Sequence, residues 1–464
     1  MSSLQAFYEA RAVHRRKELA RYYQRLMQRY YRFLVPPAAH VLELGCSSGE
    51  LLAAVQPARG VGMDFSPTII AQARERHPQL EFHVADAADL PITGPFDYIL
   101  LSDLVNDLSD VQSVLESLHR VASPHTRLVF NFFNHLWRPV LALAERLGEK
   151  ARTPQQNWLA PHDMRNLLHL AGWELIREES RILWPVRTPL IETVLNRCLA
   201  PFLRPLCLTM FMVARPRIRP NPESSQYRCT VVVPARNEAG NIEPALRRIP
   251  EMGKGTEIIF IEGHSSDQTW EAIQRAAAAH PERTVRVLKQ KSRGKGGAVR
   301  EAFAVAQGDI LFILDADLTM PPEDLPKYYE ALRSGTSEFV NGVRLVYPME
   351  DEAMRFLNMV ANKCFSLAFS WLLGQPVKDT LCGTKVLFRR DYEAIARNRV
   401  YFGDFDPFGD FDLLFGAAKL NLRIVDLPIR YQARTYGETN IQRWRHGWLL
   451  LRMVWFAARR LKFI

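Results

Sequence analysis

Cysteines are few in this sequence, and long apolar runs are missing. The six cysteines are scattered and form no C-x-x-C pair, so neither a zinc site nor a disulfide framework is expected, and a reducing cytosol suits the chain. No stretch reaches the roughly 20 apolar residues of a membrane-spanning helix. Residues 1–23 are charged and lack the apolar core of a secretory signal. We therefore expect a cytoplasmic protein.

Acidic residues are outnumbered by basic ones. The 60 Lys and Arg against 50 Asp and Glu give a net charge of +10, which favours an anionic partner such as a nucleotide or an acidic membrane surface. The aromatic residues are dispersed and no nucleic-acid-binding motif is present, so a nucleic acid partner is not expected. With 464 residues, the chain is long enough for two or three domains.

A polar, proline-rich stretch divides the chain. "ARPRIRPNPESSQYR" (residues 214–228) has no apolar periodicity, as is usual for interdomain linkers. On each side of it, short β-branched runs alternate with helical patterns, which is typical of α/β folds with parallel sheets. The predicted parts are a helical segment at 1–34, a Rossmann-like domain at 35–214, a linker at 215–227, a second Rossmann-like domain at 228–440 and a basic, aromatic C-terminal helix at 441–464.

Three strand ends in the first half carry small or acidic residues. "HVLELGCSSGELLAAV" predicts a strand, a turn and a helix, in which Gly45 and Gly49 let the backbone come close to a ligand. Asp64 ends the next strand, where a carboxylate can bind ribose hydroxyls. Asp86 follows the third strand. The pattern favours a nucleotide-type ligand at this sheet edge; the alternative is a glycine turn and two carboxylates without a ligand.

This order of motifs resembles the class I S-adenosylmethionine-dependent methyltransferases across the whole first domain. Glu43-x-Gly45-x-x-x-Gly49 matches the first motif of that family. The resemblance implies that S-adenosylmethionine binds here, with Asp64 at its ribose and Asp86 at its adenine. A dinucleotide site is disfavoured because G-x-G-x-x-G is missing.

Candidate catalytic residues of the first half follow its later strands. Asp103 and Asn106 come after the fourth strand, and Asn134 and His135 come after "RLVFNFF". Both positions are on the side where ligands bind an open sheet. We take His135 as the candidate base; an ordinary surface histidine is the alternative.

Four successive strand ends in the second half carry polar residues. They come from "CTVVVPARNEAGNIEPAL", "EIIFIEGHSSDQTW", "SRGKGGAVREAFAVA" and "GDILFILDADL". The residues brought to one sheet edge are Pro234, Ala235, Asn237, Glu238, Glu262, Lys295, Asp315 and Asp317. A metal ion on Asp315 and Asp317, either Mg²⁺ or Mn²⁺, neutralises a departing diphosphate, and Lys295 adds a point charge. These positions therefore predict a nucleotide-sugar donor site.

These motifs resemble the family 2 inverting glycosyltransferases of GT-A fold, and most closely their polyprenyl-phosphate and dolichyl-phosphate sugar transferases. The resemblance covers about residues 228–440. It implies that the P-x-x-N-E segment and Glu262 hold the nucleoside, Lys295 the diphosphate, and the two aspartates the metal. Glu262 stands where aspartate is usual and His264 where serine is common. Both departures bear on which base or sugar is accepted.

The acceptor side is marked by three further segments. "DTLCGTKVLFRRD" resembles the acceptor segment of that family, with Lys385 where arginine is usual. "RTYGETNIQRW" resembles its arginine-x-x-glycine-x-serine-lysine loop and retains Arg434, but Thr439 and Asn440 replace the serine and the lysine. In "YFGDFDPFGDFDLLF" we take Asp410 as the candidate general base; a solvated acidic loop is the alternative.

Two amphipathic segments favour contact with a membrane surface. The apolar helix expected at 354–371 has a thin polar stripe, and residues 443–464 combine Trp and Phe with flanking Arg and Lys. Packing inside the protein is the alternative. We expect a bifunctional enzyme at the inner face of a membrane that glycosylates a lipid or lipid-linked acceptor and methylates the same product or pathway. The rival hypothesis is transfer to a soluble saccharide, with a first domain that only binds or tethers.

Overall fold

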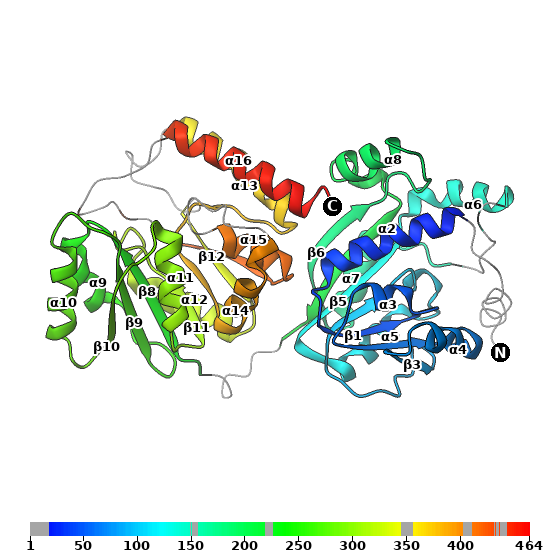
Figure 1. Cartoon of the computed structure of the whole chain (residues 1–464), viewed down its shortest axis with the longest axis horizontal. Coiled ribbons are helices and arrows are strands. Elements are labelled where there is room, and N and C mark those ends of the chain that lie inside the picture. The colour runs from blue at the N-terminus through cyan, green and yellow to red at the C-terminus, as the bar shows by residue number, and fades with distance from the viewer. Residues whose placement is uncertain are drawn as a thin grey trace. The chain divides into compact units, whose positions relative to one another are not determined.

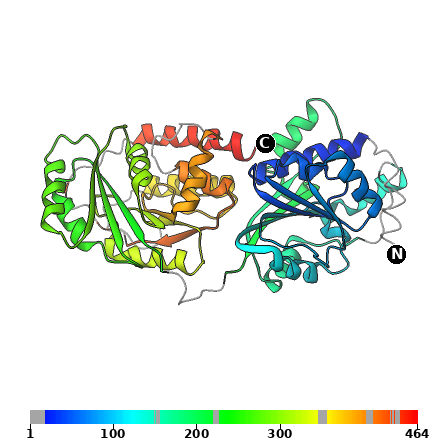
Figure 2. The same ribbon diagram turned by 60° about the horizontal axis from the view of Figure 1, so that its bottom comes forward.

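The computed structural model describes residues 18–148, 150, 156–218, 226–344, 356–401, 411–430, 432, 436 and 443–464 (Figure 1). Contacts within the chain divide it into two compact units. The first is Met1–Arg217 with Lys462–Ile464, and the second is Ile218–Leu461. Each unit contains a 7-stranded sheet with helices on its faces, as two views show (Figures 1 and 2).

The first unit has the strand order β3-β2-β1-β4-β5-β7-β6. Its strands are β1 (His40–Leu44), β2 (Arg59–Asp64), β3 (Glu81–Val84), β4 (Phe96–Leu101), β5 (Ala122–Phe133), β6 (Trp173–Arg181) and β7 (Thr209–Pro216). Its helices are α2 (Glu18–Leu34), α3 (Glu50–Ala54), α4 (Pro67–Arg76), α5 (Val111–Ser117), α6 (Arg138–Arg146), α7 (Pro161–Leu170) and α8 (Ile191–Thr193). Short helices are η1 (Val105–Asp107), η2 (Leu118–Val121), η3 (His135–Trp137), η4 (Val194–Leu199) and η5 (Arg204–Leu206).

The first five strands of this sheet are parallel, and β7 runs antiparallel between β5 and β6. The strand order reverses between β1 and β4, and an open parallel sheet binds ligands at such a point, beyond the carboxyl ends of the strands. Local signals set the helix that follows β2, because the Ser66 side chain accepts the N–H of Ile69 and Pro67 takes the first helical position.

The second unit has the order β10-β9-β8-β11-β13-β12-β14. Its strands are β8 (Cys229–Ala235), β9 (Thr256–Glu262), β10 (Thr284–Lys289), β11 (Ile310–Ile313), β12 (Phe339–Val343), β13 (Lys385–Phe388) and β14 (Ile424–Pro428). Its helices are α9 (Ile242–Arg248), α10 (Thr269–Ala279), α11 (Lys295–Val305), α12 (Leu325–Arg333), α13 (Phe356–Leu373), α14 (Arg389–Arg397), α15 (Phe411–Lys419) and α16 (Arg443–Leu461). Short helices are η6 (Ala239–Asn241), η7 (Pro322–Asp324) and η8 (Arg399–Tyr401).

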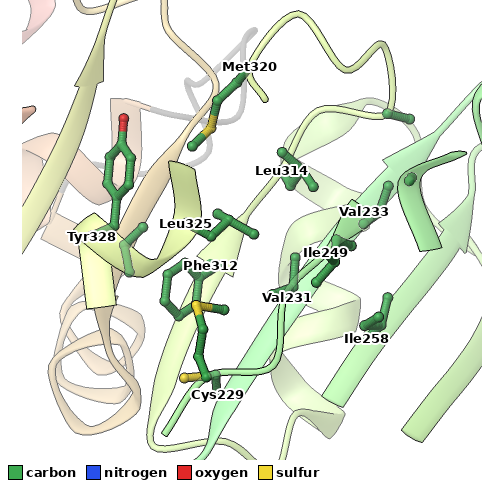
Figure 3. Close-up of a cluster of buried hydrophobic side chains, with 14 of the residues drawn as sticks. Cys229, Val231, Val233, Ile249, Ile258, Phe312, Leu314, Met320, Leu325 and Tyr328 are labelled. Carbon is green, nitrogen blue, oxygen red and sulfur yellow. The ribbon is translucent and has the colours of Figure 1, made fainter. Parts of the chain in front are cut away.

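Strands β10, β9, β8 and β11 are parallel, while β13 runs antiparallel between β11 and β12. Val231 and Val233 of β8 pack with Phe312 of β11 in the core beneath α12 (Figure 3). These side chains are fully buried, and each such burial stabilises the fold by about 1.5–3 kcal/mol. The core therefore fixes the ends of β8 and β11 side by side.

The predicted fold class is confirmed, because both units are α/β with largely parallel sheets. The strand expected at "MFMVARP" is β7, which runs to Pro216; the first two residues assigned to the linker therefore end this strand. Helices occur at both predicted amphipathic segments, as α13 and α16. In the described part of the chain, no helix is long and apolar enough to cross a membrane.

Candidate active sites at two sheet edges

The turn after β1 is tight and closely packed. Gly45 and Gly49 have φ values of +67° and +75°, a region that favours glycine. A Cβ atom at Gly45 would lie 2.9 Å from Cδ1 of Leu104, and one at Gly49 would lie 2.6 Å from Cζ of Phe82. Both positions therefore require glycine, which explains the spacing seen in the sequence.

Two carboxylates lie beside this turn. Asp64, at the end of β2, accepts the N–H groups of Ser47 and Ser66 at 3.1 and 3.0 Å. Burial raises the pKa of Glu43 well above its usual value, and its Oε2 has no hydrogen-bond partner among the described residues. A buried oxygen without a donor, next to Asp64, fits the amino and hydroxyl groups of S-adenosylmethionine.

Two other predicted residues of the first unit, Asp86 and His135, are exposed, whereas Asn106 and Asn134 are buried. Asp86 lies past the end of β3, and its Oδ1 accepts the N–H of Ala88 at 2.9 Å. Since β3 pairs with β2, Asp86 shares the sheet edge with Asp64. His135 begins η3 after β5 and is exposed. Its role as a base stays a prediction.

A buried polar cluster beyond β4 was not predicted as a unit. Asp103 has a φ of +54°, and its Oδ1 accepts hydrogen bonds from the Tyr23 hydroxyl (2.8 Å) and the Asn131 amide. The Asn131 Oδ1 accepts in turn the N–H of Asp103 (3.1 Å) and the Tyr31 hydroxyl (2.8 Å). Helix α2, which lies in the expected N-terminal helical segment, is therefore bound to the sheet edge through Tyr23 and Tyr31. Sequence patterns carry no signal for such a contact between distant residues.

The cluster gives a pH dependence to stability. Desolvation raises the pKa of Asp103 from 3.8 to about 6, against the lowering effect of Tyr23 and Asn131. Between these values the folded state keeps a proton that the unfolded state has lost. The contribution of Asp103 to the free energy of unfolding is therefore complete below pH 4. It decreases by up to about 3 kcal/mol as the pH rises to 6.

Asp103→Asn should remove this pH dependence, because an amide does not titrate. Asparagine also tolerates the left-handed conformation at this position. Urea unfolding of both proteins between pH 4 and 7 measures the difference in stability. Parallel curves for wild type and variant would contradict a raised pKa for Asp103.

The second site begins where β8 and β9 end side by side. Pro234 and Ala235 close β8, and Ala235 lies opposite Glu262 of β9. Glu262 accepts the N–H of Ser265. The nearby turn is held by Asn237, whose Oδ1 accepts the Ser266 N–H at 2.8 Å.

Glu238 follows in the same segment. Its Oε2 accepts a hydrogen bond from Asn241 at 2.7 Å, and only 8% of the residue is exposed. The segment with Pro234, Ala235, Asn237 and Glu238 therefore lies at the same sheet edge as Glu262. Their role as a nucleoside site stays a prediction.

The two aspartates of the predicted metal site, Asp315 and Asp317, follow β11. Asp315 Oδ1 lies 2.7 Å from Lys295 Nζ, and Lys295 begins α11. Desolvation raises the pKa of Asp315, but the charges of Lys295, Lys385 and Arg344 together lower it, so the pKa lies below its usual value. Asp317 Oδ1 accepts the N–H and hydroxyl of Thr319 at 3.2 and 2.9 Å. Two hard carboxylates at one strand end are suitable ligands for Mg²⁺ or Mn²⁺.

Among the described residues, no group of three or more His, Cys, Asp or Glu side chains is placed to hold a metal ion. The two aspartates therefore supply only part of a coordination shell. Mg²⁺ keeps waters and substrate phosphate oxygens as ligands at such sites, so the donor set fits a metal that arrives with a diphosphate.

Gly383 is a site residue that sequence reasoning missed. A Cβ atom there would overlap with Asp315 Oδ2 and with Lys295 Nζ, so its backbone passes directly beside both groups. Lys385, two residues later, is fully buried, and its Nζ donates to the Cys382 carbonyl. The structure thus places Lys385 inside the sheet rather than on a surface, and its role toward an acceptor stays a prediction.

Two predicted residues, Asp410 and Arg434, lie outside the described residues. A partly buried ion pair was also not foreseen. Arg344, just after β12, lies 2.8 Å from Asp379, and its charge, like that of Lys385, lowers the pKa of Asp315. Several cations therefore act on the same carboxylate, and this favours its ionised form.

Comparison with known proteins matches both units. Residues 230–397 match the family described as Glycosyl transferase family 2, and residues 41–125 match a Methyltransferase domain. The dolichol-phosphate mannosyltransferase of Pyrococcus furiosus is 29% identical over 217 residues, which cover 46% of this chain and 59% of that protein. The undecaprenyl-phosphate 4-deoxy-4-formamido-L-arabinose transferase of Edwardsiella ictaluri is 25% identical over 214 residues, covering 45% and 62%.

The chain thus spans less than two thirds of the length of these relatives. A solved structure of glucosyl-3-phosphoglycerate synthase from Mycobacterium tuberculosis, in complex with Mn²⁺, uridine diphosphate and its product, is 21% identical. It covers 51% of this chain and 80% of that one, with a TM-score of 0.37. The family matches confirm the two resemblances drawn from the motifs. The chain carries a methyltransferase domain in its first unit and a family 2 glycosyltransferase domain in its second.

Proposed function

We propose that this chain is a bifunctional enzyme that transfers a sugar from a nucleotide-diphosphate sugar to a polyprenyl-phosphate-like acceptor, with inversion, and methylates the same product or pathway. The observation that carries the first activity is the group of Lys295, Asp315 and Asp317 at the carboxyl end of β11. The acceptor class is supported by the two curated relatives, which are named for dolichol phosphate and undecaprenyl phosphate.

The residues of the second unit divide the work of sugar transfer. Glu238 and Glu262 bind the nucleoside, and Lys295 holds a diphosphate oxygen. Asp315 and Asp317 would hold Mg²⁺ or Mn²⁺, which would supply positive charge beside the diphosphate. Because Lys295 keeps Asp315 ionised, the metal site is charged before the donor arrives.

A donor panel tests this activity. UDP-, GDP- and dTDP-sugars are incubated with polyprenyl phosphate or with a soluble saccharide, in Mg²⁺, Mn²⁺ or EDTA. We expect turnover of one donor with the lipid acceptor, lost in EDTA. Turnover with only the saccharide would favour the soluble acceptor, and turnover that ignores EDTA would exclude the metal site.

The proposal of methyl transfer by the first unit rests on the Gly45 turn and Asp64. S-adenosylmethionine supplies an electrophilic methyl group when bound. The protein's own part is to hold the ribose on Asp64 and to exclude water at the edge of β1 and β4. The same contacts would also suit a module that only binds S-adenosylmethionine, so binding and methylation are measured separately.

Asp64→Ala should weaken S-adenosylmethionine binding about 100-fold, because two hydrogen bonds to a charged group are worth about 3 kcal/mol or more. Calorimetry on the full chain measures the affinity. Asp97→Asn is the matched control, since Asp97 lies exposed at the opposite end of β4. Equal affinity in Asp64→Ala and wild type would contradict the ribose assignment.

Peripheral contact with the cytoplasmic face of a membrane is part of the proposal. On α16, Trp448 and Trp455 are 64% and 61% exposed, and Leu367 of α13 is 62% exposed. The two helices lie side by side (Figure 1). Exposed tryptophans on a basic helix suit a lipid headgroup region.

A further inference from the structure

Exposed apolar side chains gather in two segments of the first unit. Among the described residues, 13 of the 21 exposed large hydrophobic side chains lie at positions 136–147 and 184–206. They are Leu136, Val140, Leu143, Leu147, Trp184, Val186, Leu190, Ile191, Val194, Leu199, Phe202, Leu203 and Leu206. We call this group the apolar surface. Such a concentration of exposed apolar side chains marks an interaction site.

Helix α6 contributes one clear stripe to this surface. Val140 and Leu143 lie in α6, and Leu136 and Leu147 lie just before and just after it. Their spacing of four, three and four lines one face of a helix. No residue of α6 is buried. The stripe therefore faces away from the core of its own unit, and its apolar character is not explained by packing there.

The charges around the apolar surface are mainly positive. The arginines in the two segments are Arg138, Arg146, Arg187, Arg197 and Arg204. The two acidic side chains are both engaged within the unit: Glu145 pairs with Lys150, and Glu192 accepts the N–H of Thr188 at 2.9 Å. Apolar residues flanked by arginine match an anionic lipid surface, which offers apolar chains below negative headgroups.

The pairing of β5, β6 and β7 places the apolar surface at the sheet edge where the ligand of the first unit is expected. Thr209, which begins β7, lies opposite Phe133 at the end of β5 and opposite Arg181 at the end of β6. Both apolar segments therefore leave the sheet at one edge, the edge that also carries the Gly45 turn and Asp64.

Three hydrogen bonds hold the segments together at that edge. Asn134 donates to the carbonyls of Pro205 and Cys207 at 2.7 and 3.0 Å. Trp137 Nε1 donates to the Leu206 carbonyl at 2.9 Å. The apolar surface is thus a continuous feature of one end of the sheet.

We propose that the apolar surface docks the methyltransferase unit on an anionic bilayer, so that its acceptor is a membrane-bound molecule reached from the headgroup region. The docking surface is separate from the α13 and α16 contact proposed above and involves different residues. The statement about the acceptor rests on the proposed methyl transfer, whereas the docking itself does not.

Vesicle binding by the full chain tests the docking. Leu147→Ser, Leu190→Ser and Leu206→Ser are combined, because all three side chains are more than half exposed and their loss spares the core. Val84→Ser with Leu170→Ser is the matched control, since these exposed side chains lie outside the apolar surface. With vesicles of 30% phosphatidylglycerol in phosphatidylcholine, we expect binding at least tenfold weaker in the triple variant and unchanged in the control.

Hydrogen exchange on the same protein locates the contact. Vesicles should protect peptides from 138–147 and 190–206, and pure phosphatidylcholine should protect them less. Protection confined to α13 and α16, or equal binding by the triple variant and the control, would overturn the docking surface. A concentration-dependent dimer that the triple variant loses, without vesicle protection, would assign the surface to a second copy instead.

Calorimetry with S-adenosylmethionine separates this inference from the proposed function. The triple variant should bind S-adenosylmethionine as wild type does. Vesicle binding in a protein that binds no S-adenosylmethionine would keep the docking and exclude the methyl-transfer assignment.

Discussion

Asp317→Asn should lower sugar transfer about 1,000-fold, while the chain stays folded. Asparagine keeps the oxygen that accepts the N–H and hydroxyl of Thr319, so the turn after β11 is preserved. It removes the negative charge that a hard metal ion needs. A 1,000-fold loss corresponds to about 4 kcal/mol of transition-state stabilisation, which is reasonable for a metal that neutralises a departing diphosphate.

The measurement is donor turnover at saturating Mg²⁺ or Mn²⁺. Asp309→Asn is the matched control, because Asp309 precedes β11 at the opposite end and is exposed. We expect the control to retain wild-type turnover. A variant at position 317 with normal turnover and an unchanged metal requirement would remove Asp317 from the metal site.

Gly383→Ala should lower sugar transfer at least 100-fold with little change in stability. The added methyl group overlaps with Asp315 Oδ2 and Lys295 Nζ, which are the ends of two flexible side chains. They can move aside, so unfolding should change by no more than about 1 kcal/mol. The pair would then separate, and a displacement of about 1 Å at a reacting centre costs about 100-fold in rate.

Thermal unfolding and donor turnover are measured on the same preparation. Gly447→Ala is the matched control, because a Cβ there meets nothing within 4 Å. Wild-type turnover in Gly383→Ala would show that the close approach of this backbone is not needed. A large loss of stability would instead mean that the overlap is relieved by the backbone.

The donor side of the second unit was the part most open to prediction. Parallel strands end at one sheet edge, so a polar tip after each strand places Glu238, Glu262, Lys295 and the aspartates together without knowledge of the tertiary structure. The glycine turn of the first unit is predictable for the same reason, since Gly45 and Gly49 take conformations that few other residues adopt.

Contacts between distant segments were not open to prediction in this way. Tyr23 reaches Asp103 across 80 positions, and Gly383 lies beside Asp315 because β13 inserts antiparallel next to β11. The burial of Lys385 follows from the same insertion, since a strand at an edge would have left its ammonium in water. Sequence periodicity fixes which residues share a face but not which strand becomes a neighbour.

The sequence by itself determined the two α/β units, their order and the strand-end residues, because these depend on local periodicity and on turn chemistry. Only the tertiary structure decided which side chains meet across the sheet and which apolar residues stay uncovered. The spacing of α6 reads equally as a buried or an exposed face in the sequence. The structure shows that no residue of α6 is buried. Burial depends on how the chain packs, which periodicity alone does not give.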